Sequence, residues 1–209
     1  LKLSYQFGDC QDQQVVQFGF RDLESVEGKL LLNGYTLFLR GEHDPGSFPL
    51  TGYPSMGKDE WLRIFMNGKE YGLNHWRFHS WCPPEAAFAA ADEVGIYLQP
   101  ELPLFSQNWE NTLVGQDVAR DEFLFSELQR LLDTYGNHPS FMFMCMGNEL
   151  KGDTTVLKNW VAYGKEYDDR HLYASNANLE AMGLFLPLEG DEFQVAHAAK
   201  VDGKRYERR

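Results

Sequence analysis

The stretch Phe141-Met142-Phe143-Met144-Cys145-Met146-Gly147-Asn148-Glu149 decides the fold of this chain. Its first six residues form the most apolar run of the sequence, which is typical of a strand buried in a protein core. The run stops at a glycine that is followed by two polar residues. It therefore predicts a buried strand that carries Asn148 and Glu149 at its carboxyl end.

Short apolar runs and longer helical patterns alternate on both sides of this strand, from Tyr35 onward. Helices are predicted where apolar residues recur at helical spacing, at 57–71, 85–94, 117–135 and 154–168. Strands are predicted at 36–41, 73–78, 96–102, 141–146, 172–175 and 193–198. This alternation indicates an α/β fold with parallel strands joined by helical crossovers.

The residues that follow the predicted strands distinguish a closed barrel from an open doubly wound sheet. An open sheet usually has a glycine-rich phosphate loop after its first strand, and residues 40–44 contain none. Polar residues instead follow the strands, namely His43, Arg77, His79, Glu101, Asn148, Glu149, Asn176, Asn178 and His197. Barrel enzymes build their active sites at this rim. The sequence therefore favours a partial (β/α)8 TIM barrel over residues 35–209, with about six of the eight strands.

Residues 1–34 differ in composition and pattern: they are rich in Gln and Asp and contain short runs typical of β-strands. They end with an apolar run at 29–32 and the turn signal Asn33-Gly34. We expect the end of a β domain and a linker, which is too little to fold alone. The chain begins at Leu1 without a leader and reads as a segment of a longer protein. An isolated segment is expected to be unstable or to associate, so a homo-oligomer stays open.

Composition excludes some classes of partner. The net charge of −12 argues against nucleic acid or an anionic membrane surface as a partner, because both attract basic proteins. No apolar run reaches the length of about 18 residues that a membrane span needs. The cysteines Cys10, Cys82 and Cys145 have no CxxC spacing and suggest no disulfide framework. The compartment is undetermined, and a periplasmic or secreted location stays open.

Glu149 is the strongest candidate for a catalytic residue. A carboxyl group beside an apolar strand loses hydration, which favours its protonated form. A protonated carboxylic acid can protonate a glycosidic oxygen as the leaving group departs. Asn148 could donate a hydrogen bond to the sugar hydroxyl next to the reacting carbon. The alternative is that the Asn–Glu pair only caps the following helix.

The run Asn137-His138-Pro139-Ser140, followed by a strand and Gly147-Asn148-Glu149, resembles glycoside hydrolase family 2, the family of β-galactosidases, β-glucuronidases and β-mannosidases. Further motifs of similar kind occur in order between residues 18 and 101. These are Phe18-Gly19-Phe20-Arg21, Leu32-Asn33-Gly34, Leu39-Arg40-Gly41, Gly72-Leu73-Asn74 with Arg77, and Asp92-Glu93-Val94-Gly95-Ile96 with Glu101. One departure is Ser80, which stands where the family usually has His; the neighbouring His79 lies one place earlier.

The resemblance implies a retaining glycosidase for β-linked sugars, with Glu149 as acid/base and Asn148 beside it. No cofactor is expected. Residues 1–34 would then be the tail of an immunoglobulin-like β-sandwich. A retaining enzyme needs a second carboxylate about 5 to 5.5 Å from the first. In the family this nucleophile is a Glu on the seventh strand, so it is expected beyond Arg209. Glu189 and Glu192 precede the sixth predicted strand and are poor substitutes, and the segment alone is expected to be inactive.

The remaining candidates are expected to bind carbohydrate or to support the site. Arg77 would hold carboxylates at the rim or form a structural pair inside the barrel, and Glu101 would accept from sugar hydroxyls or hold Arg77. His79, Trp81 and Trp109 are candidates for the lining of the sugar pocket, and Asn176, Asn178 and His197 are candidates for the rim of the site.

Two other functions compete with the glycosidase. A metal-dependent barrel hydrolase could use His43, His79 and His197, but the sequence has neither an HxH nor an HExxH motif, so no metal is predicted. A catalytically inactive carbohydrate-binding or scaffold barrel stays open, because the nucleophile is missing from the sequence.

Overall fold

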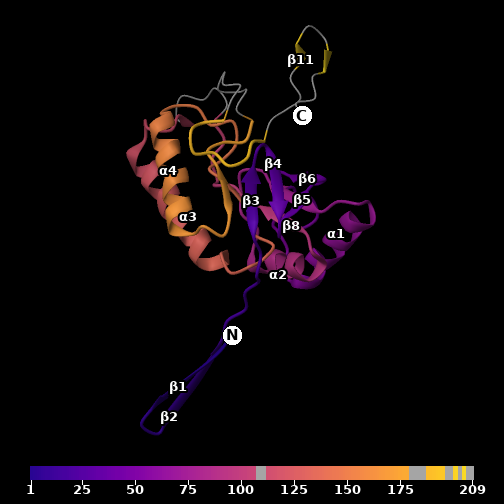
Figure 1. Cartoon of the computed structure of the whole chain (residues 1–209), viewed down its shortest axis with the longest axis vertical. Helices are drawn as coiled ribbons and strands as arrows, with labels where there is room; N and C mark the ends of the chain where they lie inside the picture. Colours follow the sequence, from indigo (N-terminus) through magenta and orange to yellow (C-terminus); the bar gives the residue numbers. More distant parts are fainter. Residues whose placement is uncertain (107–111, 179–186, 196–199, 202–203, 206–209) are drawn as a thin grey trace.

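The computed structural model describes residues 1–106, 112–178, 187–195, 200–201 and 204–205. The N-terminal part is antiparallel. Strands β1 (Lys2–Phe7) and β2 (Cys10–Val15) form a hairpin that projects away from the rest of the molecule (Figure 1). Strands β3 (Leu23–Val26), β4 (Lys29–Leu32) and β5 (Tyr35–Leu37) form a three-stranded sheet. Near the C-terminus, β11 (Lys200–Val201) pairs with β12 (Lys204–Arg205).

The larger part of the chain alternates strands and helices. The strands are β6 (Gly41–Asp44), β7 (His75–Phe78), β8 (Tyr97–Gln99), β9 (Phe143–Cys145) and β10 (Leu172–Ala174). The helices are α1 (Lys58–Glu70), α2 (Glu85–Val94), α3 (Val118–Tyr135) and α4 (Thr154–Tyr167). This alternation confirms the predicted α/β class.

The neighbouring strands of this part are parallel. β6, β7 and β8 form one sheet, and β9 pairs with β10. Parallel bridges from Leu98 to Phe141 and from Glu101 to Cys145 connect β8 to β9. The spatial order therefore follows the sequence from β6 to β10, and all of these strands end on the same side.

One strand prediction needs correction, and a second lies partly outside the described residues. Residues 36–41 do not form one strand: β5 pairs antiparallel with β4, and the first parallel strand is β6, which begins at Gly41. The physical reason is the Asn33–Gly34 turn, where both residues have positive φ, 52° and 77°. Such a turn sends the chain back along β4, so Tyr35–Leu37 must complete a hairpin. In the predicted strand 193–198, Val195 bridges Ala177, and residues 196–199 lie outside the described part.

The helix limits follow from local signals. Helix α2 begins directly after Pro84 and ends before Gly95, whose φ of 77° is the left-handed conformation that favours glycine at a helix end. Asp117 caps α3 by accepting a hydrogen bond from the Arg120 amide, and Asp153 caps α4 through Thr155. These three helices thus lie where the sequence predicts them.

The main hydrophobic core lies between the helices and the parallel strands. Trp61 and Phe65 of α1, Phe88 of α2 and Leu128 of α3 are fully buried in it. A second cluster joins Met142 and Phe143 to apolar side chains of the three-stranded antiparallel sheet, including Leu30 and Leu32. That sheet therefore packs against the strand that ends at the Asn–Glu pair. None of the described helices has the length and apolar character to cross a membrane.

The amino ends of β9 and β10 are tied together by a polar network, which we call the amino-end network: Arg21, Asp92, His138, Asp168, Arg170 and His171. The Arg21 guanidinium donates to the carbonyls of His138, Phe141 and Arg170 and contacts His171 Nδ1. Burial and the nearby Arg170 lower the pKa of Arg21 to about 10. This arginine attaches the N-terminal segment to strands more than a hundred residues away in the sequence.

Candidate active site

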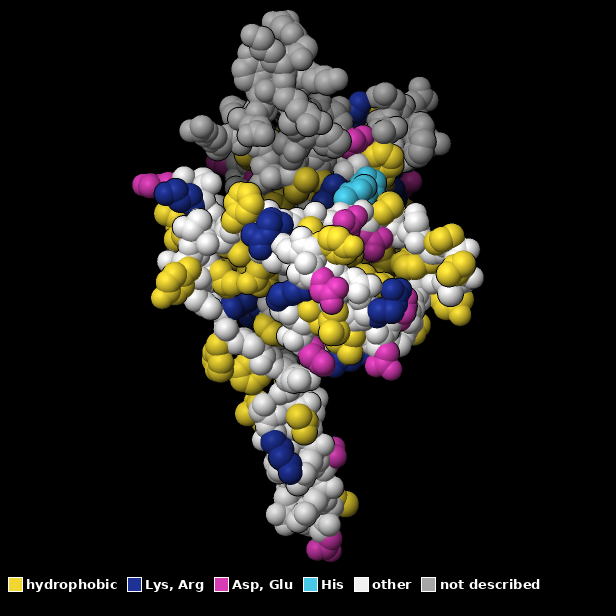
Figure 2. Space-filling model, turned by 90° about the vertical axis from the view of Figure 1, so that its right-hand side faces the viewer, with side chains coloured by type: hydrophobic (Ala, Val, Ile, Leu, Met, Phe, Trp, Pro, Cys, Tyr) yellow, Lys and Arg dark blue, Asp and Glu magenta, His cyan; other side chains and the backbone are white. Residues whose placement is uncertain are grey.

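A cavity of about 630 Å³ lies at the carboxyl ends of the parallel strands. It is lined by Gly41, Glu42, His43, His75, Arg77, His79, Gln99, Phe105, Asn148, Glu149 and Val195. Figure 2 shows histidine side chains at one place on the viewed face, near the end opposite the N-terminal hairpin. Four of the predicted site residues, Arg77, His79, Asn148 and Glu149, thus line one cavity.

Glu149 lies just after β9, at a backbone position set by its neighbours. Gly147 has a φ of 140°, and a Cβ there would lie 2.6 Å from the Leu104 carbonyl oxygen, so the turn requires glycine. Glu149 itself has a positive φ of 51°, which is uncommon for a residue with a side chain. Its amide donates to the Ala177 carbonyl at 2.8 Å. Asn178 Nδ2 donates to Glu149 Oε1 at 2.6 Å, and the Glu149 side chain lines the cavity half-buried.

Arg77 binds the other polar residues at the strand ends. Its Nε donates to Glu101 Oε1 at 2.6 Å, and its Nη2 donates to Asn148 Oδ1 at 2.7 Å. The second Glu101 oxygen accepts from the Ser80 amide. Glu101 is fully buried, and burial raises its pKa although Arg77 acts in the opposite direction. Arg77 is thus held between a buried carboxylate and the amide next to Glu149.

Three rings form one wall of the cavity. The His43 and His79 rings meet edge to face with centroids 4.9 Å apart, and His79 meets Phe105 at 5.4 Å. Burial and the positive charge of Arg77 lower the pKa values of both histidines. At neutral pH this wall therefore offers neutral imidazoles, which can donate and accept hydrogen bonds with hydroxyl groups.

The floor of the cavity contains polar atoms without partners. His75 and Gln99 are nearly buried, and the Nε2 atoms of both lack a hydrogen-bond partner among the described residues. Burial lowers the pKa of His75 to about 4. Sequence analysis did not select these residues. The signal was available, because His75 and Gln99 lie two positions before Arg77 and Glu101 and therefore share their face of the strands.

The other predicted site residues lie elsewhere or outside the described part. The Trp81 indole donates to the Asp44 carbonyl and packs against Phe48 and Phe78, so it pins a loop to the core and does not line the cavity. Both ends of the Asn176 amide bind the Leu150 backbone. Trp109 and His197 lie outside the described residues. Within the described ranges, no group of three or more His, Cys, Asp or Glu side chains could hold a metal ion.

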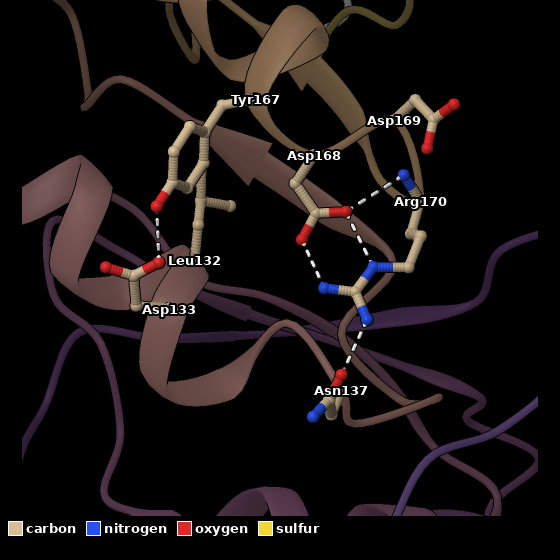
Figure 3. Close-up of a pocket in the computed structure, with 7 residues that line it drawn as sticks. All are labelled: Leu132, Asp133, Asn137, Tyr167, Asp168, Asp169 and Arg170. Carbon is tan, nitrogen blue, oxygen red and sulfur yellow. Dashed lines mark hydrogen bonds and ion pairs between the residues drawn. The ribbon is translucent and has the colours of Figure 1, made fainter.

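A second hollow, of about 400 Å³, lies beside the amino-end network (Figure 3). Apart from Asp169, whose carboxylate makes no contact with the other residues drawn, its charged groups are bound to one another. Arg170 donates to both oxygens of Asp168 and to Asn137, and the Tyr167 hydroxyl donates to Asp133. Because these groups are already paired, the hollow is a structural junction between α3 and the residues after α4.

No family model matches the chain, but individual proteins do. It is 27% identical over 181 residues to the β-galactosidase large subunit of Latilactobacillus sakei, covering 82% of this chain and 29% of that protein. It is 23% identical over 185 residues to a β-galactosidase of Photobacterium profundum, covering 87% and 18% respectively. The chain therefore spans less than a third of these relatives.

Solved structures show the same kind of fold. The β-glucuronidase of Parabacteroides merdae matches with a TM-score of 0.71 and 24% identity over 86% of this chain and 23% of that one. The β-D-glucuronidase of Dictyoglomus thermophilum matches with a TM-score of 0.74 and 18% identity over 82% and 31%. Together the relatives and the fold confirm the resemblance to glycoside hydrolase family 2.

Proposed function

We propose that this chain is part of the catalytic barrel of a retaining β-glycosidase, in which Glu149 is the general acid/base. The observation that carries the proposal is the position of Glu149, at the carboxyl end of a buried parallel strand and in a cavity with Arg77, His79 and Asn148. The relatives that match most of this chain are named β-galactosidases, which supports carbohydrate as the substrate.

The architecture that we propose is a partial (β/α)8 barrel over residues 35–209, preceded in residues 1–34 by the tail of an immunoglobulin-like β-sandwich. The parallel order from β6 to β10 supports the barrel, and the isolated parallel bridge between Ala177 and Val195 supports a sixth strand there. The antiparallel strands β1 to β5 support the β-sandwich tail.

In the first step Glu149 donates its proton to the glycosidic oxygen. The bond between that oxygen and the anomeric carbon breaks while a second carboxylate bonds to the same carbon. In the second step water bonds to the anomeric carbon, the carboxylate departs, and Glu149 takes the proton of the water. We expect the second carboxylate from a later strand of the longer polypeptide, in the part of the relatives that this chain does not span.

Arg77 and Asn148 would position the reacting groups. Arg77 orients the Asn148 side chain by donating a hydrogen bond to its Oδ1, so the Asn148 NH₂ group points away from Arg77. That NH₂ group could then donate to the sugar hydroxyl beside the anomeric carbon, a hydrogen bond that strengthens in the transition state. His43 and His79 would accept from and donate to other hydroxyls of the sugar.

The test is Glu149→Gln in the longer polypeptide, assayed on aryl glycosides. With a poor leaving group, kcat/KM should fall about 10²- to 10⁴-fold, because general acid catalysis is lost. With an activated leaving group the first step should change little. Azide, which needs no general base, should restore turnover and give a glycosyl azide of retained configuration.

The control is Glu189→Gln, the same change at an exposed side chain outside the cavity, which should leave all rates unchanged. Equal loss on both kinds of leaving group would remove the acid/base role from Glu149. Sugar binding without hydrolysis of any aryl glycoside would favour a carbohydrate-binding barrel instead. A panel of galactosides, glucuronides and mannosides would identify the sugar.

A further inference from the structure

The two oxygens of the Glu149 carboxylate have different surroundings. Oε1 accepts a hydrogen bond of 2.6 Å from Asn178 Nδ2, and Oε2 accepts none from the described residues. An amide nitrogen carries hydrogens and no available lone pair, so the oxygen that it contacts cannot hold a proton between them. Asn178 therefore restricts where a proton can sit on Glu149.

Backbone conformation and backbone hydrogen bonds fix the relative positions of Glu149 and Asn178. Both have positive φ, 51° for Glu149 and 61° for Asn178, a conformation that costs free energy in residues with side chains. The Ala177 carbonyl accepts from the Glu149 amide at 2.8 Å, and the Asn178 amide donates to the Val195 carbonyl at 2.7 Å. Unfavourable backbone conformations held by such contacts often occur at functional sites.

The side chain of Asn178 donates a hydrogen bond to Glu149, but its own oxygen accepts none from the described residues. Its Oδ1 is buried and lacks a hydrogen-bond partner among the described residues, which is unfavourable for stability. Asn74 shows what a structural amide does in the same chain. Its Oδ1 accepts from the Arg40 amide and its Nδ2 donates to the Phe38 carbonyl, so both ends are paired. The unpaired end of Asn178 indicates that stability alone does not explain its orientation.

We infer that Asn178 is a positioning residue that reserves Oε1 of Glu149 and leaves Oε2 as the oxygen that carries the catalytic proton. The inference rests on the proposed function of Glu149. In the acid state the proton sits on Oε2 and passes to the leaving oxygen, while Oε1 is the carbonyl oxygen. In the base state Oε2 takes the proton of water. Asn178 can donate to Oε1 in both states, so its hydrogen bond persists through the cycle.

Of the other titratable groups that line the cavity, Arg77 is paired, the histidines are neutral at neutral pH, and Glu42 is an exposed carboxylate on β6 that a substitution of Asn178 leaves in place. Arg77 binds Glu101 and Asn148, and Glu101 also accepts from the Ser80 amide. His43 and His79 have lowered pKa values because of burial and Arg77. A change in the alkaline limb of the pH profile is therefore assigned to the Glu149–Asn178 pair.

The test is Asn178→Asp in the longer polypeptide. The new carboxylate cannot donate to Oε1, and it draws the Glu149 proton into the contact between the two carboxylates. On a glycoside with a poor leaving group, kcat/KM should fall about 100-fold, and on an activated dinitrophenyl glycoside less than about 5-fold. The alkaline limb of kcat/KM should move to higher pH by about one unit, since two like charges share the proton. Asn178→Ala should change both quantities in the same direction by less.

The matched control is Asn74→Asp, which makes the same chemical change and adds the same charge just before β7, at a residue that does not line the cavity. It should leave the leaving-group dependence and the alkaline limb unchanged. The inference is wrong, and the role of Asn178 is structural, if Asn178→Asp behaves like Asn74→Asp. The same holds if Asn178→Asp lowers kcat/KM equally for all substrates and leaves the alkaline limb of the pH profile in place. A thermal melt shows whether Asn178→Asp folds. If it does not fold, the leaving-group dependence and the alkaline limb of Asn178→Ala test the inference instead. A Glu149→Gln variant without leaving-group dependence would overturn the proposed function separately.

Discussion

The carboxyl and amino ends of the parallel strands both carry buried polar groups, but only the carboxyl end leaves several of them unpaired. At the carboxyl end, Ser80, Gln99 and Asn178 each have a buried side-chain atom without a partner among the described residues. His75, the first residue of β7, has such an atom too and lines the same cavity. Ser80, Glu149 and Asn178 also have positive φ at the carboxyl end. In the amino-end network Arg21 Nε is the one buried side-chain atom that lacks a partner among the residues that the structure describes.

The difference in unpaired polar atoms indicates which end of the strands contributes mainly to stability. Unpaired buried polar atoms and left-handed backbone are unfavourable for folding and persist where a ligand or a reaction uses them. The amino-end network has paired donors and acceptors that join β9, β10 and the N-terminal segment. Mutations at the carboxyl end should therefore change catalysis, and mutations at the amino end should change stability alone.

The largest expected effect comes from Arg77→Met at the carboxyl end. It leaves the fully buried Glu101 carboxylate without its charged partner, and the side chain of Arg77 is itself only 12% exposed. Breaking a buried pair from one side lowers the unfolding free energy by about 3–5 kcal/mol. Urea titration of the tryptophan fluorescence measures it. We also expect kcat/KM to fall, because Asn148 loses the group that orients it.

The double variant Arg77→Met/Glu101→Gln separates the two consequences. Removing the unpaired charge should recover part of the unfolding free energy and none of the activity. Full recovery of activity would show that Arg77 has no part in catalysis, and the contrast between the two ends would then be weaker.

A smaller effect is expected from Arg21→Met at the amino end. The variant loses the hydrogen bonds to the carbonyls of His138, Phe141 and Arg170. Hydrogen bonds from charged donors contribute about 1.5–3 kcal/mol, so we expect a loss of about 2–3 kcal/mol in unfolding free energy. At a temperature where the variant is folded, kcat and KM should not change. Arg63→Met, which removes an exposed helix pair with Glu60, is the control and should leave the thermal midpoint unchanged. A changed KM in Arg21→Met would mean that the amino end also shapes the cavity.

The smallest effect is a pH dependence of stability at His138. Burial lowers the pKa of His138, but hydrogen bonds and charges from Asp92 and Glu85 outweigh it, and the net shift is upward. A raised folded pKa means that the stabilisation is complete below the unfolded value, about 6.5, and is lost as pH rises through the folded value. The destabilisation caused by His138→Gln should therefore be about 1 kcal/mol at pH 5.5 and smaller at pH 8.5.

Thermal midpoints of the wild type and His138→Gln at both pH values measure this difference. Asp92 has a pKa lowered by His138 and Ser140 against the effect of burial, so it stays ionised over this range. A destabilisation that is equal at both pH values would show that His138 acts through packing against Phe88 rather than through its charge.

The sequence by itself determined the features that depend on neighbours a few residues apart. Pro84 and Gly95 bound α2 at the predicted residues, because caps act within one turn of a helix. The apolar run before Gly147 predicted a buried strand with Glu149 after it, since a side chain that follows a parallel strand must lie at the carboxyl edge. Arg77, His79 and Asn148 were predicted for the same edge and line one cavity with Glu149.

Only the tertiary structure decided which distant groups meet. Asn178 reaches Glu149 from a separate strand end 29 residues later, and Arg21 reaches the Phe141 carbonyl from 120 residues earlier. The predicted strand 36–41 is split because Tyr35–Leu37 pairs with β4. Trp81 packs against Phe48 and Phe78 in the core and does not line the cavity. The physical reason is that hydrogen bonds and ring contacts act over a few ångströms. The order and register of the strands therefore select the partners, and no short stretch of sequence contains that order.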